Sequence, residues 1–187
     1  MKQTILFLQG GGEGAYEADA QLVASLRRAL GDTYAIQYPK MPDEDDPDYE
    51  RWKPVIEKEL EKLGSNAIVI AHSLGGSFLL KFLVEEKPRK KIAGIFLIAT
   101  PYWGGDGWRY EGYERVALPD GFARRMPHGA SIFIYHGRND EIVPYAHLAL
   151  YAERLPQAHT RSLESGHQLN NDLAEVAADI RSLRAAT

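Results

Sequence analysis

The stretch Ala71-His72-Ser73-Leu74-Gly75-Gly76 joins two segments of opposite character. The residues just before it, 67–70, are apolar and β-branched, which predicts a buried strand. The residues after it place Phe78, Leu79, Phe82 and Leu83 three and four apart, which predicts a helix with one apolar face. A serine therefore stands at the corner between a strand and a helix, among residues with small side chains.

This arrangement is typical of a nucleophile elbow, with Ala71 where glycine is usual. The turn is so sharp that a large side chain two residues before or after the serine would collide, and Ala71 and Gly75 avoid this. The strained turn lifts the Ser73 hydroxyl above the sheet edge, at a helix N-terminus whose dipole favours developing negative charge. A plain strand–turn–helix with small residues for packing is the alternative, and the position between this strand and this helix favours the nucleophile.

Composition excludes several other classes of protein. The chain has 187 residues, 44% of them hydrophobic and 26% charged, which is typical of one globular domain. Its net charge of −4 gives no indication of binding to nucleic acid or to a membrane surface. The absence of cysteine excludes disulfides, thiolate metal sites and a cysteine nucleophile. The first four residues lead into a strand without a signal or spanning segment, so we expect a cytoplasmic protein.

Strands and helices alternate along the chain. Apolar runs predict strands at 5–8, 67–70, 92–98 and 131–135, and two further strands are expected at 34–38 and 158–163. Helical spacing predicts helices at 22–30, 52–63, after Ser73, at 145–155 and at 169–183, with Pro54 starting or kinking the second. Because the strands are apolar throughout, we expect an α/β fold: a three-layer α/β/α sandwich whose open, mainly parallel sheet has about six strands.

Three connecting segments stand out. Residues 42–47 are acidic and bounded by prolines, which predicts a surface loop rather than a cation site. Residues 85–91 form a charged connection, expected to be a solvated turn. Residues 101–130 are rich in glycine and aromatics, and we expect them to form a short cap or loop insertion within a single domain spanning 1–187. Their aromatic side chains could wall a substrate pocket or only pack the segment down; the candidates for the pocket are Trp103, Trp108 and Tyr110.

The carboxyl ends of later strands supply candidate partners for Ser73. Ligands bind beyond these ends in open parallel sheets. A serine hydroxyl needs a general base, and the base needs an orienting carboxylate. Asp140 follows the strand at 131–135, and His167 follows the strand at 158–163. The order serine, acid, histidine at three strand ends predicts a catalytic triad with Ser73 as nucleophile, Asp140 as acid and His167 as base.

Other acids compete with Asp140 for its role. Glu141 is its neighbour, and Glu164 lies close to the candidate base in the sequence. Asp140 is favoured because Val143 anchors its loop while Pro144 opens the next helix.

Other histidines compete with the candidate base. His167 is favoured because Gly166 makes a turn before it and the closing helix follows directly. We expect His72 to point away from Ser73 and to serve packing, and His136 to support the loop of Asp140.

A glycine-rich turn at 10–14 follows the first strand and suits an oxyanion hole, which needs two backbone N–H groups aimed at one point. We expect one donor to be Leu74, at the start of the helix, and the other to be Gly11, with Gly12 the next candidate. Losing one such donor typically costs about 10²–10³-fold in kcat.

The same turn admits a competing interpretation. Gly10-x-Gly12-x-x-Ala15, after a strand and before a helix, matches a dinucleotide fingerprint. Against it, the second strand ends in Tyr38-Pro39-Lys40, where an acid for the ribose is expected, and Glu13 and Glu17 would repel a pyrophosphate. It also leaves the triad residues unexplained. No P-loop lysine follows the glycines and no histidine-based metal pattern occurs, so we expect no metal.

Four motifs together resemble those of the α/β-hydrolase superfamily over nearly the whole chain: Gln9-Gly10-Gly11, Ala71 to Gly75, His136-Gly137-Arg138-Asn139-Asp140 through Pro144, and Gly166-His167. The short length resembles the small serine hydrolases of the retinoblastoma-binding-protein-nine type. The resemblance implies a minimal six-stranded α/β-hydrolase fold, the same three triad residues, and cofactor-free hydrolysis of small carboxylic esters or, less often, amides. Gln9 stands where histidine is usual, and the family's cysteine-containing partner motif cannot exist here.

The sequence therefore predicts a serine hydrolase of the carboxylesterase type, which cleaves a small-molecule ester through an acyl-enzyme. The alternative is a non-catalytic ligand- or protein-binding module on the same fold. Dinucleotide binding at the glycine-rich turn is a third interpretation. Reaction of Ser73 with a fluorophosphonate separates the first two.

Overall fold

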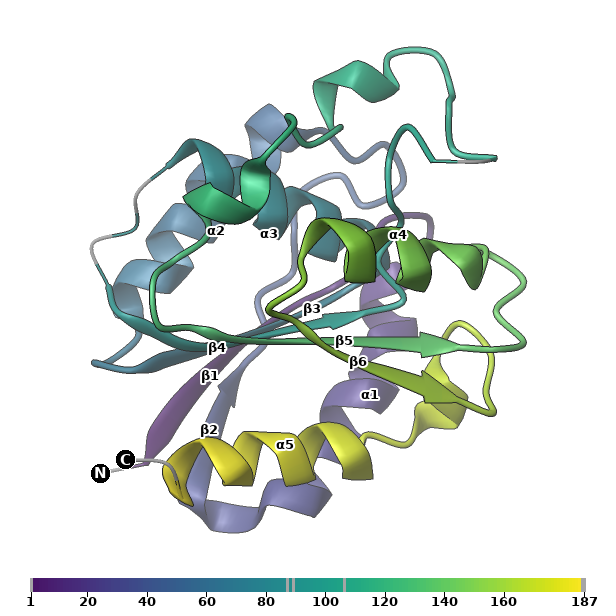
Figure 1. Ribbon diagram of the computed structural model, residues 1–187. Helices are drawn as coiled ribbons and strands as arrows, with labels where there is room; N and C mark the ends of the chain where they lie inside the picture. Colours follow the sequence, from purple (N-terminus) through teal and green to yellow (C-terminus); the bar gives the residue numbers. More distant parts are fainter. Residues whose placement is uncertain (1, 87, 89, 106, 186–187) are drawn as a thin grey trace.

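The computed structural model describes residues 2–86, 88, 90–105 and 107–185, and within them six strands form one parallel sheet (Figure 1). The strand order is β2-β1-β3-β4-β5-β6, and each neighbouring pair is parallel. The strands are β1 (Gln3–Leu8), β2 (Tyr34–Gln37), β3 (Ala67–His72), β4 (Ile92–Ile98), β5 (Ser131–Gly137) and β6 (His159–Leu163). The predicted α/β fold with an open sheet of about six strands is confirmed.

Helices cover both faces of this sheet, which completes the three layers (Figure 1). Two of them lie against one face, α1 (Ala15–Leu30) and α5 (Ala174–Ala185). Three lie against the other face: α2 (Tyr49–Lys62), α3 (Ser73–Glu85) and α4 (Ala146–Arg154).

The central strand β3 shows why its sequence is a continuous apolar run. All six of its residues are buried. Ile68 and Ile70 join the core beneath α1 and α5, whereas Val69 and Ala71 join the core beneath α2 and α3. Since a helical layer covers each face, a polar side chain on this strand needs an internal partner. His72, the last residue of β3, is the one such case on it.

The closing helix begins later than the apolar spacing predicts. Residues Leu169–Asn171 form a short 3₁₀ turn with φ between 45° and 55°, and α5 begins only at Ala174. The Asp172 carboxylate accepts a hydrogen bond from the Ala174 N–H at 2.9 Å and so caps the helix start. Leu169 and Leu173 are nonetheless buried. The spacing thus reflected the core contacts of a turn, not of a helix.

The second helix also departs from the prediction. It begins at Tyr49, and the side chain of Asp48 caps it by accepting a hydrogen bond from the Arg51 N–H at 3.1 Å. Pro54 does not start the helix but lies inside it. The capping residue Asp48, which precedes the residues with apolar helical spacing, sets the start of the helix.

Residues 101–130 connect β4 to β5 and run along the side of the molecule that holds α2, α3 and α4 (Figure 1). In the described part of this segment the regular structure consists of two short 3₁₀ turns, Tyr113–Arg115 and Phe122–Arg125. Phe122 and Met126 are buried in the core on that side. The segment therefore packs onto the helical layer.

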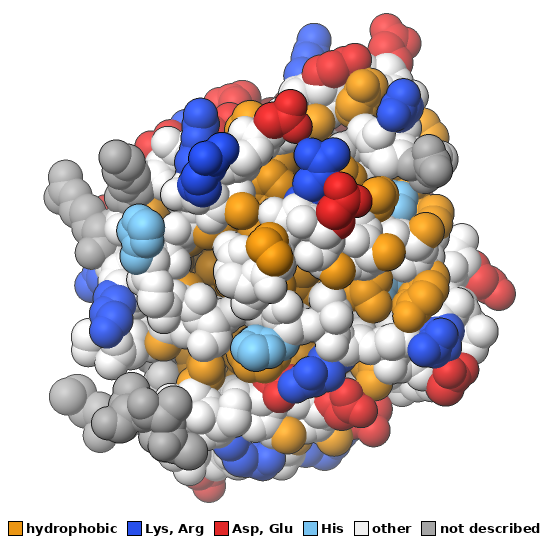
Figure 2. Space-filling view, in the orientation of Figure 1, with side chains coloured by type: hydrophobic (Ala, Val, Ile, Leu, Met, Phe, Trp, Pro, Cys, Tyr) orange, Lys and Arg blue, Asp and Glu red, His pale blue; other side chains and the backbone are white. Residues whose placement is uncertain are grey.

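Charged side chains of both signs are interspersed on the face shown in Figure 2, with apolar side chains between them. Within the predicted charged connection at 85–91, Lys87 and Arg89 lie outside the described residues. Among the helices that the structure describes, none combines the length and the apolar character needed to cross a membrane.

Candidate active site

Ser73 lies at the sharp turn between β3 and α3. Its φ of 49° is in the left-handed region, which residues with a side chain rarely adopt. A Cβ on Gly75 would lie 2.1 Å from the carbonyl oxygen of Gln9, and a Cβ on Gly76 would lie 2.0 Å from Oγ1 of Thr100. The turn needs glycine at both positions, because the chain after β1 and the chain after β4 both press against the start of α3.

We expect Gly75→Ala to lower the free energy of unfolding by about 1–3 kcal/mol, the usual cost of overpacking. The reason is that the added Cβ meets a backbone carbonyl, which cannot rotate away as a flexible side chain could. Urea unfolding followed by circular dichroism measures the change. Gly64→Ala is the matched control, since nothing lies within 4 Å of a Cβ there. Equal stability of the two variants would contradict the close approach of α3 to the end of β1.

Asp140 lies in the loop after β5 with its carboxylate buried. Its Oδ1 accepts hydrogen bonds from the N–H groups of Ile142 and Val143, both at 2.9 Å. Its Oδ2 lies 2.9 Å from Nδ1 of His167 and 3.2 Å from Nε2 of His136. Burial raises the pKa of Asp140, but the hydrogen bonds from the two histidines and the nearby His167 outweigh this, so the pKa is held well below its usual range. The carboxylate is therefore ionised and directed at His167.

His167 follows β6, and its Nδ1 faces Asp140, which leaves Nε2 as the acceptor of the neutral ring. Burial lowers the pKa of His167, the hydrogen bond that it donates to Asp140 raises it, the charge of His72 lowers it, and the net shift is downward. The imidazole is thus neutral at neutral pH, the form in which it can take a proton.

Backbone hydrogen bonds join the loops that carry these two side chains. The Arg138 N–H donates to the Leu163 carbonyl at 2.8 Å, and the Asn139 N–H donates to the Ser165 carbonyl at 2.9 Å. A Cβ on Gly137 would lie 2.3 Å from that same Ser165 oxygen, so glycine is needed where the loops touch. The loops of Asp140 and His167 are therefore held together by backbone as well as side-chain contacts.

The competing acids do not reach the base. Glu141 is exposed, and Glu164 is largely exposed and pairs with Arg138 at 3.0 Å. His136 instead supports the acid loop as predicted, because its Nε2 lies 3.0 Å from the Val143 carbonyl and also contacts Asp140.

The elbow and the base loop are also in contact. Nε2 of His72 lies 3.2 Å from the backbone carbonyl oxygen of His167, and the two imidazole rings are 4.7 Å apart. Because Ser73 follows His72 directly, the structure brings Ser73, Asp140 and His167 to one edge of the sheet.

The glycine-rich turn lies against the elbow on its other side. A Cβ on Gly11 would lie 2.5 Å from the Leu74 side chain. The Leu74 N–H belongs to the first turn of α3, whose N–H groups have no acceptor within the helix, and no side chain caps that helix. The Gly12 N–H, by contrast, donates to the Glu44 carbonyl. Of the two glycines, Gly11 is therefore the one that remains a candidate oxyanion donor together with Leu74.

The acidic loop 42–47 packs over this turn, so the prediction of a solvated loop is wrong for Glu44. One of its carboxylate oxygens accepts hydrogen bonds from the Tyr16 N–H at 2.7 Å and from Nε2 of Gln9 at 2.8 Å. Tyr16 is in the first turn of α1, where a dinucleotide pyrophosphate would bind. A carboxylate already occupies that helix N-terminus, and this geometry opposes the dinucleotide interpretation.

The aromatic candidates form a cluster of their own. Ring centroids are 5.0 Å apart for Trp103 and Trp108, and 5.5 Å apart for Trp108 and Tyr110. Nε1 of Trp103 donates to Oγ of Ser77 at 2.9 Å, one helical turn after Ser73. Tyr110 is 58% exposed. The cluster is therefore packed onto α3 near the elbow at one end and open to solvent at the other.

The sequence-based prediction missed Asp19 and the polar contacts of Gln9 and His72, and all three residues are buried. Gln9 accepts a hydrogen bond from the Met41 N–H at 2.9 Å and so ties the acidic loop to the glycine-rich turn. His72 is buried as predicted, but it makes polar contacts, with Asp19 and with the base loop. The available signal was the place of Asp19 on α1, three and four residues before apolar Leu22 and Val23, which puts a carboxylate on the buried face.

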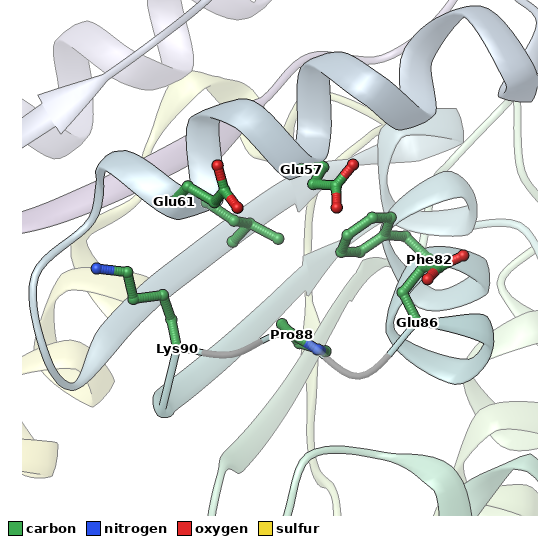
Figure 3. A pocket seen from close by; sticks show the side chains of 7 residues that line it. Glu57, Glu61, Phe82, Glu86, Pro88 and Lys90 are labelled. Carbon is green, nitrogen blue, oxygen red and sulfur yellow. The ribbon is translucent and has the colours of Figure 1, made fainter.

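A large hollow of about 620 Å³ lies elsewhere, between α2 and the end of α3 (Figure 3). It is lined by Glu57, Leu60, Glu61, Phe82, Glu86, Pro88 and Lys90. Because α3 runs away from Ser73 toward the amino edge of the sheet, Glu86 is about 20 Å along the helix from the serine. Among the described residues, no group of three or more histidine, aspartate or glutamate side chains converges as a metal site requires.

A parallel six-stranded sheet with helices on both faces, and a serine on a strained turn at its carboxyl edge, defines an α/β-hydrolase fold. The model of the serine hydrolase family matches residues 22–174, so the chain belongs to that family. No curated protein sequence matches the chain significantly.

Solved structures share the fold at low sequence identity. The ydeN gene product of B. subtilis is 19% identical with a TM-score of 0.75, over 99% of this chain and 100% of that one. The serine hydrolase CCSP0084 of Cycloclasticus zankles is 13% identical with a TM-score of 0.72, over 99% and 90%. SOBER1 of Arabidopsis thaliana is 15% identical with a TM-score of 0.69, over 98% and 99%. These likenesses agree with the hydrolase fold.

Proposed function

We propose that this serine hydrolase is an esterase that cleaves small carboxylic esters through an acyl-enzyme on Ser73. The observation that carries the proposal is the buried Asp140 carboxylate, which lies 2.9 Å from Nδ1 of His167. The backbone carbonyl of His167 in turn contacts the ring of His72, the residue before the strained Ser73. A carboxylate in this place holds the imidazole in the tautomer whose Nε2 accepts a proton, and stabilises the charged ring afterward.

The reaction would proceed in two halves. Nε2 of His167 removes the proton from Oγ of Ser73 as that oxygen attacks the ester carbonyl carbon. The N–H groups of Gly11 and Leu74 bind the resulting oxyanion. His167 then gives the proton to the leaving alcohol oxygen, which leaves Ser73 acylated. A water molecule deprotonated by His167 attacks the acyl carbon, the acid leaves, and Ser73 regains its proton.

The substrate class follows from the surroundings of the serine. The carboxylate of Glu44 lies over the glycine-rich turn, and an aromatic cluster lies beside α3. A negative charge near the oxyanion turn disfavours anionic acyl groups, and aromatic side chains favour apolar ones. We therefore infer an uncharged acyl group, with Trp103, Trp108 and Tyr110 forming part of the pocket wall.

A p-nitrophenyl ester series of increasing acyl length tests the proposal together with a fluorophosphonate probe. We expect turnover that varies with acyl length, and a single covalent adduct that peptide mapping locates on Ser73, because only an activated serine displaces the fluoride. Heat-unfolded protein serves as the control and should not be labelled. Absence of both turnover and labelling in the folded protein would contradict the proposal and favour a non-catalytic binding module.

A further inference from the structure

A second buried acid–histidine pair, Asp19 and His72, lies beside the triad and is not used by the mechanism above. Asp19 is 1% exposed and His72 is 2% exposed. A carboxylate oxygen of Asp19 lies 2.9 Å from Nδ1 of His72. Burying two ionisable groups is costly unless each of them is fully paired with hydrogen-bond partners.

The Asp19 carboxylate is bonded to three different segments of the site. It accepts hydrogen bonds from the Gly10 N–H at 2.7 Å, from His72 and from Nε2 of Gln168 at 3.0 Å. Gly10 precedes the oxyanion candidate Gly11, His72 precedes the nucleophile, and Gln168 follows the base. One carboxylate thus joins the chain after β1, the end of β3 and the chain after β6.

Both ring nitrogens of His72 face hydrogen-bond acceptors. Nδ1 meets the Asp19 carboxylate, and Nε2 meets the backbone carbonyl of His167 at 3.2 Å. An ionised carboxylate and a backbone carbonyl only accept hydrogen bonds, so beside an ionised Asp19 both ring nitrogens carry a hydrogen and the ring is an imidazolium. Burial lowers the pKa of His72, but the charge and hydrogen bond of Asp19 and the His167 carbonyl outweigh it, and the pKa is raised. Burial raises the pKa of Asp19, but His72 and the hydrogen bonds from Gln168 and Gly10 outweigh it, and the pKa is lowered.

We propose that Asp19 and His72 are positioning residues of this site, a buried imidazolium–carboxylate clamp that fixes the oxyanion turn, the nucleophile elbow and the base loop relative to one another. The proposal rests on the proposed function for its effect on rate, but the charged state of the clamp does not depend on any activity. A misplacement of about 1 Å between reacting groups can cost about 10²-fold in rate, so holding three loops at once is a large contribution.

The clamp also places the imidazolium of His72 beside the candidate base. The rings of His72 and His167 are 4.7 Å apart. The titratable groups that act on His167 are Asp140, His72 and Asp19, of which Asp140 and Asp19 raise its pKa while burial and His72 lower it. Only neutral His167 accepts the serine proton, so the rate falls as the pH falls through the pKa of His167. Because the charge of His72 acts on His167 more strongly than the charge of Asp19, neutralising the clamp moves this acid limb to higher pH.

Nuclear magnetic resonance of ¹⁵N-labelled histidine tests the charged state directly. At about pH 8, well above the ordinary histidine pKa of about 6.5, His72 should still carry hydrogens on both ring nitrogens. In Asp19→Asn it should carry one. A wild-type His72 with a single ring N–H at that pH overturns the proposal, whether or not the protein is an enzyme.

The rate of fluorophosphonate labelling, measured across pH, tests the positioning role. We expect Asp19→Asn to label about 10²-fold more slowly, with the midpoint of the acid limb moved to higher pH. If the single variant folds poorly, the double variant Asp19→Asn/His72→Gln takes its place, because it leaves no unpaired charge buried. It should show the same slower labelling and the same shift of the pH midpoint. The proposal is overturned if a folded variant is labelled at the wild-type rate and its acid limb keeps the wild-type pH midpoint.

Asp179→Asn is the matched control for these variants. Its carboxylate also lies in an ion pair with little exposure, but its partners are Arg161 and Tyr135. It should change stability without moving the pH midpoint. If wild-type protein is not labelled at all, the proposed function fails, and the ring protonation of His72 still decides whether the clamp exists.

Discussion

Replacing Ser73 with alanine is expected to abolish ester hydrolysis, with kcat about 10⁶-fold lower than in the wild type. Alanine removes only the oxygen that would form the acyl-enzyme. Because alanine tolerates the φ of 49° no worse than serine does, the turn between β3 and α3 should keep its conformation. Stopped assays at high enzyme concentration with the best p-nitrophenyl ester measure the residual rate.

Ser182→Ala is the matched control, because Ser182 is exposed on α5, on the other face of the sheet. It should hydrolyse the ester at the wild-type rate. The Ser73→Ala protein should unfold in the same denaturant range as the wild type and should not be labelled by the fluorophosphonate. Equal turnover by Ser73→Ala and the wild type would show that the hydrolysis comes from another group.

The second large effect is expected for Asp140→Asn, about a 10⁴-fold loss of kcat with the fold intact. The N–H groups of Ile142 and Val143 both point at Oδ1 of Asp140, so the asparagine oxygen must take that place. Its NH₂ group then faces Nδ1 of His167, which has to become an acceptor. The ring hydrogen moves to Nε2, and the base can no longer take a proton from Ser73.

Steady-state kinetics should show this loss mainly in kcat, because the acid does not touch the substrate. Glu164→Gln is the control, since it removes a nearby carboxylate that is exposed and paired with Arg138. An exposed ion pair contributes little, so this variant should keep wild-type activity and stability. A larger loss in Glu164→Gln than in Asp140→Asn would show that the acid has been misassigned.

The fold and the three triad candidates could be predicted because they depend on short-range patterns. A strand buried on both faces is apolar at every position, as β3 is, and this property identifies the parallel sheet. A parallel sheet brings the carboxyl ends of its strands to one edge. Residues as distant in the chain as Ser73 and His167 can then be assigned to one site from their order alone.

The remainder depends on contacts that no local pattern records. Asp19 and Gln168 are bonded across 149 positions of the chain, and neither belongs to a motif. Nothing in the acidic loop 42–47 distinguishes Glu44 from its acidic neighbours, yet its carboxylate caps the start of α1. The sequence did not indicate the late start of α5, because Leu169 and Leu173 are both buried and have the spacing of a helix, although the backbone between them forms a turn. Tertiary packing overrides spacing in each case.

The position of β6 has a consequence for how securely the site is held together. β6 is an edge strand that pairs only with β5, and all five of its residues are half-buried or exposed. His167 follows this strand, whereas Ser73 follows the central β3, which has a neighbour on each side. Edge elements with few buried apolar contacts open at a lower free energy than the centre of a sheet. We therefore expect the segment that carries His167 to open locally more readily than the turn that carries Ser73. The docking of this edge, more than the stability of the whole domain, would then set the fraction of assembled sites.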